Sequence, residues 1–177
     1  MKRLFDLALS IPAFFLLSFL MLIIAVLVRM RIGSPVLFKQ ARPGLRGRPF
    51  TIYKFRTMTD KRGEDGNLLP DSERLTRLGW FLRKTSMDEL PELFNVIKGD
   101  MSVVGPRPFR MQYVDRYTPE QARLHEVKPG ITGWAQVNGL TANLFCDFNF
   151  EVIVSLRSGR RYSNDKVRQC FPSIYNG

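Results

Sequence analysis

Two adjacent carboxylates, Asp88 and Glu89, stand at the start of an amphipathic segment in the middle of the chain. Pro91 must lie in the first turn of any helix formed there, because a proline deeper inside would break it. Asp88 is therefore expected at or beside the helix N-cap, where the helix dipole would keep it ionised and would also attract phosphate. An ionised carboxylate can attack phosphorus, while its neighbour can bind Mg²⁺ or take up a proton.

The same spacing allows two other interpretations of this segment. Ser86 and Glu89 match a capping box, in which case Asp88 serves only as a cap. Glu92 lies one turn after Asp88, so the useful pair of carboxylates could instead be Asp88 and Glu92. Apolar residues recur at the period of a helix and are expected to form its buried face: Leu90, Leu93, Phe94 and Ile97.

Short elements on the N-terminal side must position these carboxylates. Strand-like runs at residues 36–38 and 50–55 are separated by a turn with Gly and Pro at residues 42–47. Residues 61–71 are polar and are expected to form an exposed loop. A short helix is expected next, because four residues with helical spacing predict core packing: Leu75, Leu78, Phe81 and Leu82.

The charge of the chain indicates anionic partners. Its 177 residues carry a formal net charge of +11, from 27 Lys and Arg against 16 Asp and Glu. Such an excess fits lipid headgroups, phosphorylated small molecules or nucleic acid. A nucleic-acid partner is disfavoured, because the sequence has no recognisable nucleic-acid-binding module and its aromatic residues do not alternate with its basic ones.

Two later motifs could bind anions. Arg107 lies between two prolines in Gly105-Pro106-Arg107-Pro108, and an Arg on so stiff a backbone suits bidentate recognition of phosphate. Residues 128–139 form a Gly-rich run with polar side chains. This run is not a P-loop, because no Gly-Lys-Ser/Thr follows.

Cysteine and histidine offer little for catalysis. Cys146 and Cys170 have no spacing typical of a zinc site or a disulfide framework, so a reducing compartment is the default. His125 is the only histidine, and nothing around it suggests a catalytic triad. It is expected on the exposed side of a helix.

The N-terminal residues are suited to a membrane. Leu4–Val28 is apolar apart from three polar residues and would reach about 37 Å as a helix, against a hydrocarbon core of about 30 Å. A signal peptide is excluded because no small-x-small cleavage site follows. Basic residues flank both ends, which favours a hairpin that enters and leaves on one side, with Pro12 as its kink. A single straight span stays open as the alternative.

Several of these runs together resemble the bacterial sugar transferase family, the monotopic phosphoglycosyl transferases. The ordered set covers roughly residues 2–139 and is far more specific than any one motif. The matching stretches are KRLFD (2–6), FKQARPG (38–44), YKFRTM (53–58), SMDELPELFNV (86–96), KGDMS (98–102), GPRP (105–108) and PGITG (129–133).

The resemblance implies a reaction: transfer of a phospho-sugar from a UDP-sugar to polyprenyl (undecaprenyl) phosphate, with release of UMP. By position, Asp88 resembles the nucleophile that forms a covalent phospho-sugar intermediate. Glu89 resembles its partner, which is expected to deprotonate polyprenyl phosphate or organise Mg²⁺, and both carboxylates are candidate Mg²⁺ ligands. The residues expected to contact phosphate, nucleotide or other parts of the substrates are Lys54, Arg56, Arg83, Arg107 and Gln136.

The expected fold class is α/β, mostly helical with a small sheet, and the resemblance also implies an architecture. Residues 1–32 would form a re-entrant helix-break-helix in one leaflet, 33–139 a compact interfacial catalytic domain, and 140–177 an atypical tail. The location implied is the cytoplasmic face of the bacterial inner membrane, in contact with membrane lipid. Oligomeric state is open, with a homo-oligomer among the alternatives.

The sequence departs from the family pattern in two places. Ser18-Phe19 stands where a Ser-Pro pair usually breaks the membrane helix, which makes a straight span more plausible. Leu140 stands where an Arg is usual, and the tail after it lacks the usual Trp- and acid-containing helical pattern. This tail motivates an alternative function: a non-catalytic member that binds a UDP-sugar or an assembly partner.

Overall fold

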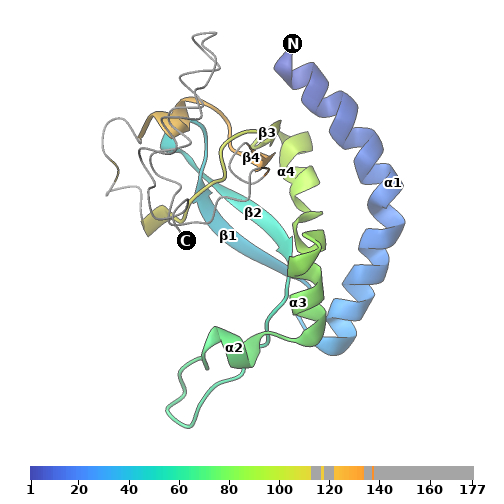
Figure 1. Cartoon of the computed structure of the whole chain (residues 1–177), viewed down its shortest axis with the longest axis vertical. Coiled ribbons are helices and arrows are strands. Elements are labelled where there is room, and N and C mark those ends of the chain that lie inside the picture. The colour runs from blue at the N-terminus through green and yellow to red at the C-terminus, as the bar shows by residue number, and fades with distance from the viewer. Residues whose placement is uncertain (113–116, 118–121, 134–136, 138–177) are drawn as a thin grey trace, which may run out of the picture.

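The computed structural model describes residues 1–112, 117, 122–133 and 137. A long N-terminal helix, α1, curves along one side of a small domain made of a two-stranded hairpin, short helices and a second strand pair (Figure 1). The expected fold class, mostly helical with a small sheet, is confirmed.

Helix α1 spans Lys2–Arg31 without interruption, although Pro12 lies inside it. The prediction that this segment breaks into two helices is therefore wrong. Pro12 removes only one backbone hydrogen bond, and a long helix can absorb that loss as curvature. The length and composition of α1 are suited to a membrane. Most of its large apolar side chains are also exposed.

Both ends of α1 are fixed to the same domain. Near the N-terminus, the Arg3 guanidinium donates to the carbonyl oxygens of Val96 and Ile97. Asp6 Oδ1 accepts from Ser102 Oγ at 2.9 Å and from the Val103 backbone N–H at 3.0 Å. Near the C-terminus, Ile24 and Val28 are buried in a core cluster with Phe55 and Leu82.

The two runs predicted as strands form β1 (Leu37–Pro43) and β2 (Pro49–Phe55), which pair antiparallel as a hairpin; β1 extends into the predicted turn. Its register runs from Leu37 opposite Phe55 to Pro43 opposite Pro49. Successive side chains of a strand point to opposite faces. The pairs Phe38–Lys54 and Lys39–Tyr53 therefore lie on opposite faces of the hairpin.

Two short helices, α2 (Asp71–Arg74) and α3 (Arg77–Lys84), follow the loop that was expected to be exposed. Thr76 caps α3 by accepting from the Gly79 backbone N–H at 2.9 Å. The predicted core packing is correct for Leu82, which is 1% exposed, and wrong for Phe81, which is 49% exposed. Leu75 ends α2 and lies outside α3.

The carboxylate segment forms a 3₁₀ turn (Met87–Glu89) followed by α4 (Glu92–Lys98). The buried residues of α4 are Glu92, Asn95 and Val96, so the predicted apolar stripe is not the buried face; Phe94 is 48% exposed. Asn95 explains the difference: its side chain bonds the backbone of β2, accepting from the Tyr53 N–H and donating to the Thr51 carbonyl. The Asn95 side chain thus pairs with the edge of β2 as a neighbouring strand would.

Strands β3 (Ser102–Val104) and β4 (Gly130–Thr132) form a short parallel pair. They approach so closely that a Cβ on Gly130 would lie 2.1 Å from the Gly105 backbone nitrogen. The pairing of β3 with β4 fixes the position where residues 105–108 begin. These residues carry Arg107 toward the hairpin.

Candidate active site

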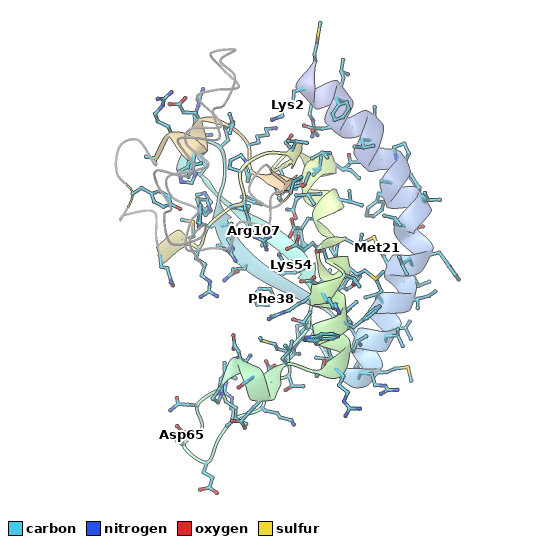
Figure 2. All side chains as sticks on the ribbon, viewed as in Figure 1. Lys2, Met21, Phe38, Lys54, Asp65 and Arg107 are labelled. Atoms are coloured by element: carbon cyan, nitrogen blue, oxygen red, sulfur yellow. The ribbon has the colours of Figure 1, made fainter. Side chains whose placement is uncertain are left out.

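A polar cavity of about 610 Å³ lies between one face of the hairpin, the loop before α2, the end of α3 and the 3₁₀ turn. Asp88 and Glu89 both line it. Figure 2 shows Lys54 and Arg107 close together where the hairpin meets this turn. Basic side chains outnumber acidic ones in the lining: Arg42, Lys54, Arg56, Arg74, Arg83, Arg107 and Arg110 against Asp60, Asp71, Asp88 and Glu89.

The local backbone directs the two carboxylates into this cavity. Ser86 has a left-handed conformation, with φ 56°, immediately before the 3₁₀ turn. The N-cap position of α4 belongs to Pro91, and no side chain caps either element. The capping-box interpretation is therefore wrong, and so is the interpretation of Asp88 as a helix cap.

Asp88 is largely buried, with 9% of its surface exposed. Burial raises the pKa of its carboxyl group and the charge of Glu89 raises it further, while Lys54 and Arg83 act in the opposite direction. The expectation that a helix N-terminus keeps Asp88 ionised is corrected, because desolvation is the largest influence and α4 begins four residues later. Lys54 and Arg83 are the nearby cations that favour its charged form.

Glu89 is held by two cations. Its Oε1 lies 2.6 Å from Lys54 Nζ and 2.9 Å from Arg107 Nη2. Burial acts to raise the pKa of Glu89, but Lys54 and Arg107 outweigh it and lower the pKa below its ordinary value. Glu89 is thus the more readily ionised of the two adjacent carboxyls.

Glu92 lies beneath the cavity and does not line it. Its Oε1 is 3.1 Å from Lys54 Nζ, and its side chain is 4% exposed. Burial raises the pKa of Glu92 to about 7, and Glu89 adds to the rise while Lys54 opposes it. Of the two pairs considered from the sequence, only Asp88 and Glu89 share the cavity.

Four of the five predicted substrate-contact residues line the cavity: Lys54, Arg56, Arg83 and Arg107. The Nε of Arg83 donates to Thr57 Oγ1 at 3.0 Å. Gln136 lies outside the described residues.

Arg56 is engaged by the protein itself. Its guanidinium donates to the carbonyl oxygens of Ser34 and Met58 and pairs with Asp60 Oδ2 at 2.5 Å. These bonds tie the end of β2 to the segment after α1. Arg56 therefore shapes the cavity wall whether or not it also contacts a ligand.

Arg42 and Arg110 line the cavity although neither was singled out as a substrate contact. Arg42 donates to Gln40 Oε1 at 2.7 Å and to the Pro108 carbonyl at 3.2 Å. Burial lowers the pKa of Arg42, and repulsion from Arg110 and Arg107 lowers it further. Strand alternation could have identified Arg42, which shares a hairpin face with Lys54.

His125 is not on the exposed side of an α-helix. It lies half-buried on a 3₁₀ turn (Arg123–Glu126), with its ring centroid 5.5 Å from that of Tyr117. Burial lowers the pKa of its imidazole. His125 does not line the cavity that holds Asp88.

The side chains of the cavity could supply only part of the ligands that Mg²⁺ needs. Among the described residues, no group of three or more His, Cys, Asp or Glu side chains could hold a metal ion. Mg²⁺, however, is commonly bound by one or two carboxylates together with substrate phosphates. Asp88 and Glu89 in one cation-rich cavity match that second arrangement.

The sequence of this chain matches a known protein family. The family model described as bacterial sugar transferase matches residues 1–162. The chain belongs to the bacterial sugar transferase family. The match includes α1, the hairpin, both carboxylates and the Arg107 segment.

Individual relatives are similarly named. A Bacillus subtilis protein named as an uncharacterized sugar transferase is 61% identical over 80% of this chain and 70% of its own length. A UDP-glucose:undecaprenyl-phosphate glucose-1-phosphate transferase from Xanthomonas campestris is 48% identical over 78% of this chain. A UDP-N-acetylgalactosamine-undecaprenyl-phosphate N-acetylgalactosaminephosphotransferase from Aeromonas hydrophila is 45% identical over 77%. The aligned part spans 30% and 33% of the lengths of these last two sugar transferases.

Proposed function

We propose that this sugar transferase moves a sugar 1-phosphate from a UDP-sugar to polyprenyl phosphate through a covalent intermediate on Asp88. The observation that carries the proposal is the placement of Asp88 and Glu89 together in a cavity whose lining is mainly Arg and Lys. A diphosphate donor and a phosphate acceptor are both anions, and they need such a surrounding to approach a carboxylate. The names of the relatives support the same substrates.

In the first half-reaction, a carboxylate oxygen of Asp88 bonds to the phosphorus that carries the sugar. The bond from this phosphorus to the oxygen that bridges the diphosphate breaks, and UMP leaves with that oxygen. Lys54, Arg83 and Arg107 offset the charge that develops on the phosphoryl oxygens. Burial of Asp88 removes water from the nucleophile and from the intermediate.

In the second half-reaction, an oxygen of polyprenyl phosphate bonds to the same phosphorus. The bond to Asp88 breaks, which restores the carboxylate and leaves a polyprenyl diphospho-sugar. Glu89 takes the proton of the incoming phosphate, because its lowered pKa and its two cationic neighbours keep it ionised and so able to accept one.

Asp88 and Glu89 are the residues that would hold Mg²⁺ in this site, together with substrate phosphates. When bound, the ion would neutralise diphosphate charge and make the phosphorus easier to attack. Lys54 and Arg107 would keep the Glu89 side chain in place for either task.

The fold supports an enzyme that sits in one leaflet at the cytoplasmic face of the inner membrane. Arg3 and Asp6 at one end of α1, and Val28 at the other, contact the same domain. A helix that crossed the bilayer would place these ends on opposite sides of it. The contacts therefore favour entry and exit on one side, in agreement with the basic residues at both ends.

Intact-protein mass spectrometry tests the proposal directly. The purified protein is incubated with Mg²⁺ and a panel of UDP-sugars, in the absence of polyprenyl phosphate, and Asp88→Asn serves as the matched variant. We expect a mass increase of one phospho-sugar on the wild-type chain, none on Asp88→Asn, and release of UMP in equal amount.

An adduct that persists in Asp88→Asn would overturn the nucleophile assignment. Binding of a UDP-sugar to the wild type without any adduct or UMP would instead support the non-catalytic alternative. The donor that gives the adduct names the sugar class.

A further inference from the structure

Ser86 joins two elements that both line the polar cavity. It follows the last turn of α3, which carries Arg83, and it precedes the 3₁₀ turn that carries Asp88 and Glu89. Its backbone N–H donates to the Arg83 carbonyl at 3.3 Å, and its own carbonyl accepts from the Glu89 N–H at 3.2 Å. The conformation of Ser86 therefore sets how Arg83 and the two carboxylates lie relative to one another.

The backbone conformation of Ser86 disfavours a serine. Its φ of 56° and ψ of 18° lie in the left-handed region, where the β-carbon crowds the backbone and glycine is favoured. After α1 and α4 the chain uses glycine for such a conformation, with Gly33 at φ 104° and Gly99 at φ 99°. Among the described residues, the only other non-glycine residue with a positive φ is Arg46 in the turn of the hairpin. Serine after α3 thus departs from what the backbone favours.

The side chain of Ser86 is placed to meet a ligand. Ser86 is exposed, it lines the cavity together with Asp88, and its hydroxyl does not cap the 3₁₀ turn. The neighbouring hydroxyl differs: Thr85 Oγ1 donates to the carbonyl oxygens of Phe81 at 2.9 Å and Leu82 at 3.2 Å. In the part of the chain that the structure describes, the Ser86 hydroxyl has no hydrogen-bond partner. A residue held in a disfavoured conformation at a functional cavity is commonly retained for what its side chain does there.

A hydroxyl group suits the phosphoryl group that Asp88 would attack. Lys54 and Arg107, which line the same cavity, are paired with Glu89. A further cation beside Asp88 would pair with this carboxylate and weaken it as a nucleophile. The hydroxyl of Ser86 is neutral and can rotate its O–H toward a phosphoryl oxygen. It can therefore bind the phosphoryl group without neutralising Asp88.

We propose that the Ser86 hydroxyl donates a hydrogen bond to a non-bridging oxygen of the phosphorus that becomes bonded to Asp88. This inference rests on the proposed function. Ser86 forms no covalent bond and gives up no proton. In the first half-reaction it holds the phosphoryl group of the UDP-sugar against Asp88, and in the second it holds the same group while polyprenyl phosphate attacks. The hydrogen bond strengthens as negative charge develops on that oxygen.

Two variants remove the hydroxyl and differ in their effect on the backbone. Ser86→Gly also removes the β-carbon and so relieves the left-handed conformation, whereas Ser86→Ala keeps the β-carbon. Arg46→Gly relieves the same kind of conformation outside the cavity, and Thr85→Val removes the neighbouring hydroxyl, so these two are the matched controls. Each protein is mixed with a saturating UDP-sugar and Mg²⁺, and the rate of adduct formation and the thermal unfolding midpoint in detergent are measured.

We expect both Ser86 variants to form the adduct about tenfold more slowly than the wild type. Ser86→Gly should nevertheless raise the unfolding midpoint by about 2–4 °C, and Ser86→Ala should not. Arg46→Gly should raise the midpoint by a similar amount, and both controls should form the adduct at the wild-type rate. Wild-type rates in both Ser86 variants would overturn the proposal. A slow rate in Ser86→Gly alone would assign the effect to backbone flexibility and would overturn it as well.

Nucleotide binding gives an independent measurement. UDP carries a terminal phosphate in the place of the phosphate that bears the sugar, and UMP lacks it. By calorimetry with Mg²⁺, Ser86→Ala should bind UDP about fivefold more weakly than the wild type and UMP within about twofold. Equal weakening for both nucleotides, or none for UDP, would overturn the proposal. If the wild type forms no adduct with any donor, the proposed function fails, and the difference between UDP and UMP still decides whether Ser86 holds the terminal phosphate.

Discussion

At the scale of single residues, Lys54 links two carboxylates whose pKa values are shifted in opposite directions. Its Nζ lies 2.6 Å from Glu89 and 3.1 Å from Glu92, and all three side chains are mostly shielded from water. Glu89, with a second cation in Arg107, has a lowered pKa, whereas the more deeply buried Glu92 has a raised one. The ammonium group thus lies at the cavity wall between an ionised carboxylate and a proton-retaining one.

Glu92 predicts a pH-dependent stability. Its pKa is about 7 in the folded protein against 4.5 for an ordinary Glu, so between these values only the folded state keeps the proton. The contribution of Glu92 to the free energy of unfolding is therefore full below pH ~4.5 and is lost as the pH rises through ~7. A shift of this size corresponds to about 3 kcal/mol.

Glu92→Gln should remove this dependence, because an amide does not titrate and can still accept from Lys54. The measurement is the thermal unfolding midpoint in detergent at pH 5 and pH 8. The variant should gain stability relative to wild type at pH 8, whereas Glu64→Gln in the exposed loop should follow the wild type at both. An equal effect of Glu92→Gln at the two pH values would contradict the assigned titration.

The sequence sufficed to single out Asp88 and Glu89, since both the residue types and their place before Pro91 are local features. It could not show that Lys54 pairs with Glu89, because the two are far apart in the chain and only the packing of β2 on the 3₁₀ turn brings them together. It also placed Asp88 at a helix N-terminus, whereas α4 begins four residues later. Burial is a property of the folded chain, and here it is the largest influence and raises the pKa of Asp88.

At the scale of elements, α3 holds the cavity wall through a close backbone contact. A Cβ on Gly79 would lie 1.9 Å from the carbonyl oxygen of Thr57. The contact brings α3 onto the chain just after β2, where Arg83 reaches Thr57 Oγ1 and lines the cavity with Arg56. No side chain larger than hydrogen fits at position 79 without moving the helix.

Gly79→Ala should therefore destabilise the protein by about 3 kcal/mol, the upper range for overpacking. The measurement is the loss of folded protein in a thermal or protease-resistance assay in detergent. Gly63→Ala is the matched control, because its added Cβ would meet side-chain atoms of Asp65 and Leu69 and no backbone atom. Equal stability of the Gly79→Ala and Gly63→Ala proteins would show that α3 can shift away from Thr57.

Elements were predicted better than the faces they bury. The hairpin and the helices after it follow from local pattern and turn residues. The apolar stripe of α4 was assigned to the core because helical periodicity normally marks the buried face. In this protein the polar residue Asn95 is buried instead, since it replaces a strand partner for β2, and the apolar stripe faces α1 and the exterior.

At the scale of the whole molecule, α1 behaves as part of the domain. A helix of 30 residues is about 45 Å long, more than a hydrocarbon core of about 30 Å. Arg3 donates to the last carbonyl groups of α4, where a cation is favoured, and the opposite end packs with α3 and β2. The contacts at its two ends could not be predicted from apolar composition alone, which is equally compatible with a span.

This arrangement predicts the accessibility of α1 from the two sides of a membrane. In a chain with Cys146 and Cys170 replaced by Ser, Lys2→Cys and Arg31→Cys are labelled with a membrane-impermeant maleimide in sealed vesicles of either orientation. Both should react from the same side as Glu64→Cys in the exposed loop. Leu16→Cys should resist the reagent, because its 83% exposed side chain would face lipid.

Labelling of Lys2→Cys only from the side opposite Glu64→Cys would establish a spanning helix. It would also require that the bonds of Arg3 and Asp6 to the domain do not form in the membrane.

The alternation along β1 and β2 has a consequence for the divergence of sugar transferases. Side chains such as Phe38 and Lys54 belong to one chemical environment, and their immediate neighbours Lys39 and Tyr53 belong to another. A point mutation on either strand therefore alters one environment and leaves the other intact, except at Phe55, which lines both. Substitutions at alternate positions of the same hairpin can therefore change the polar cavity and the apolar face independently of each other.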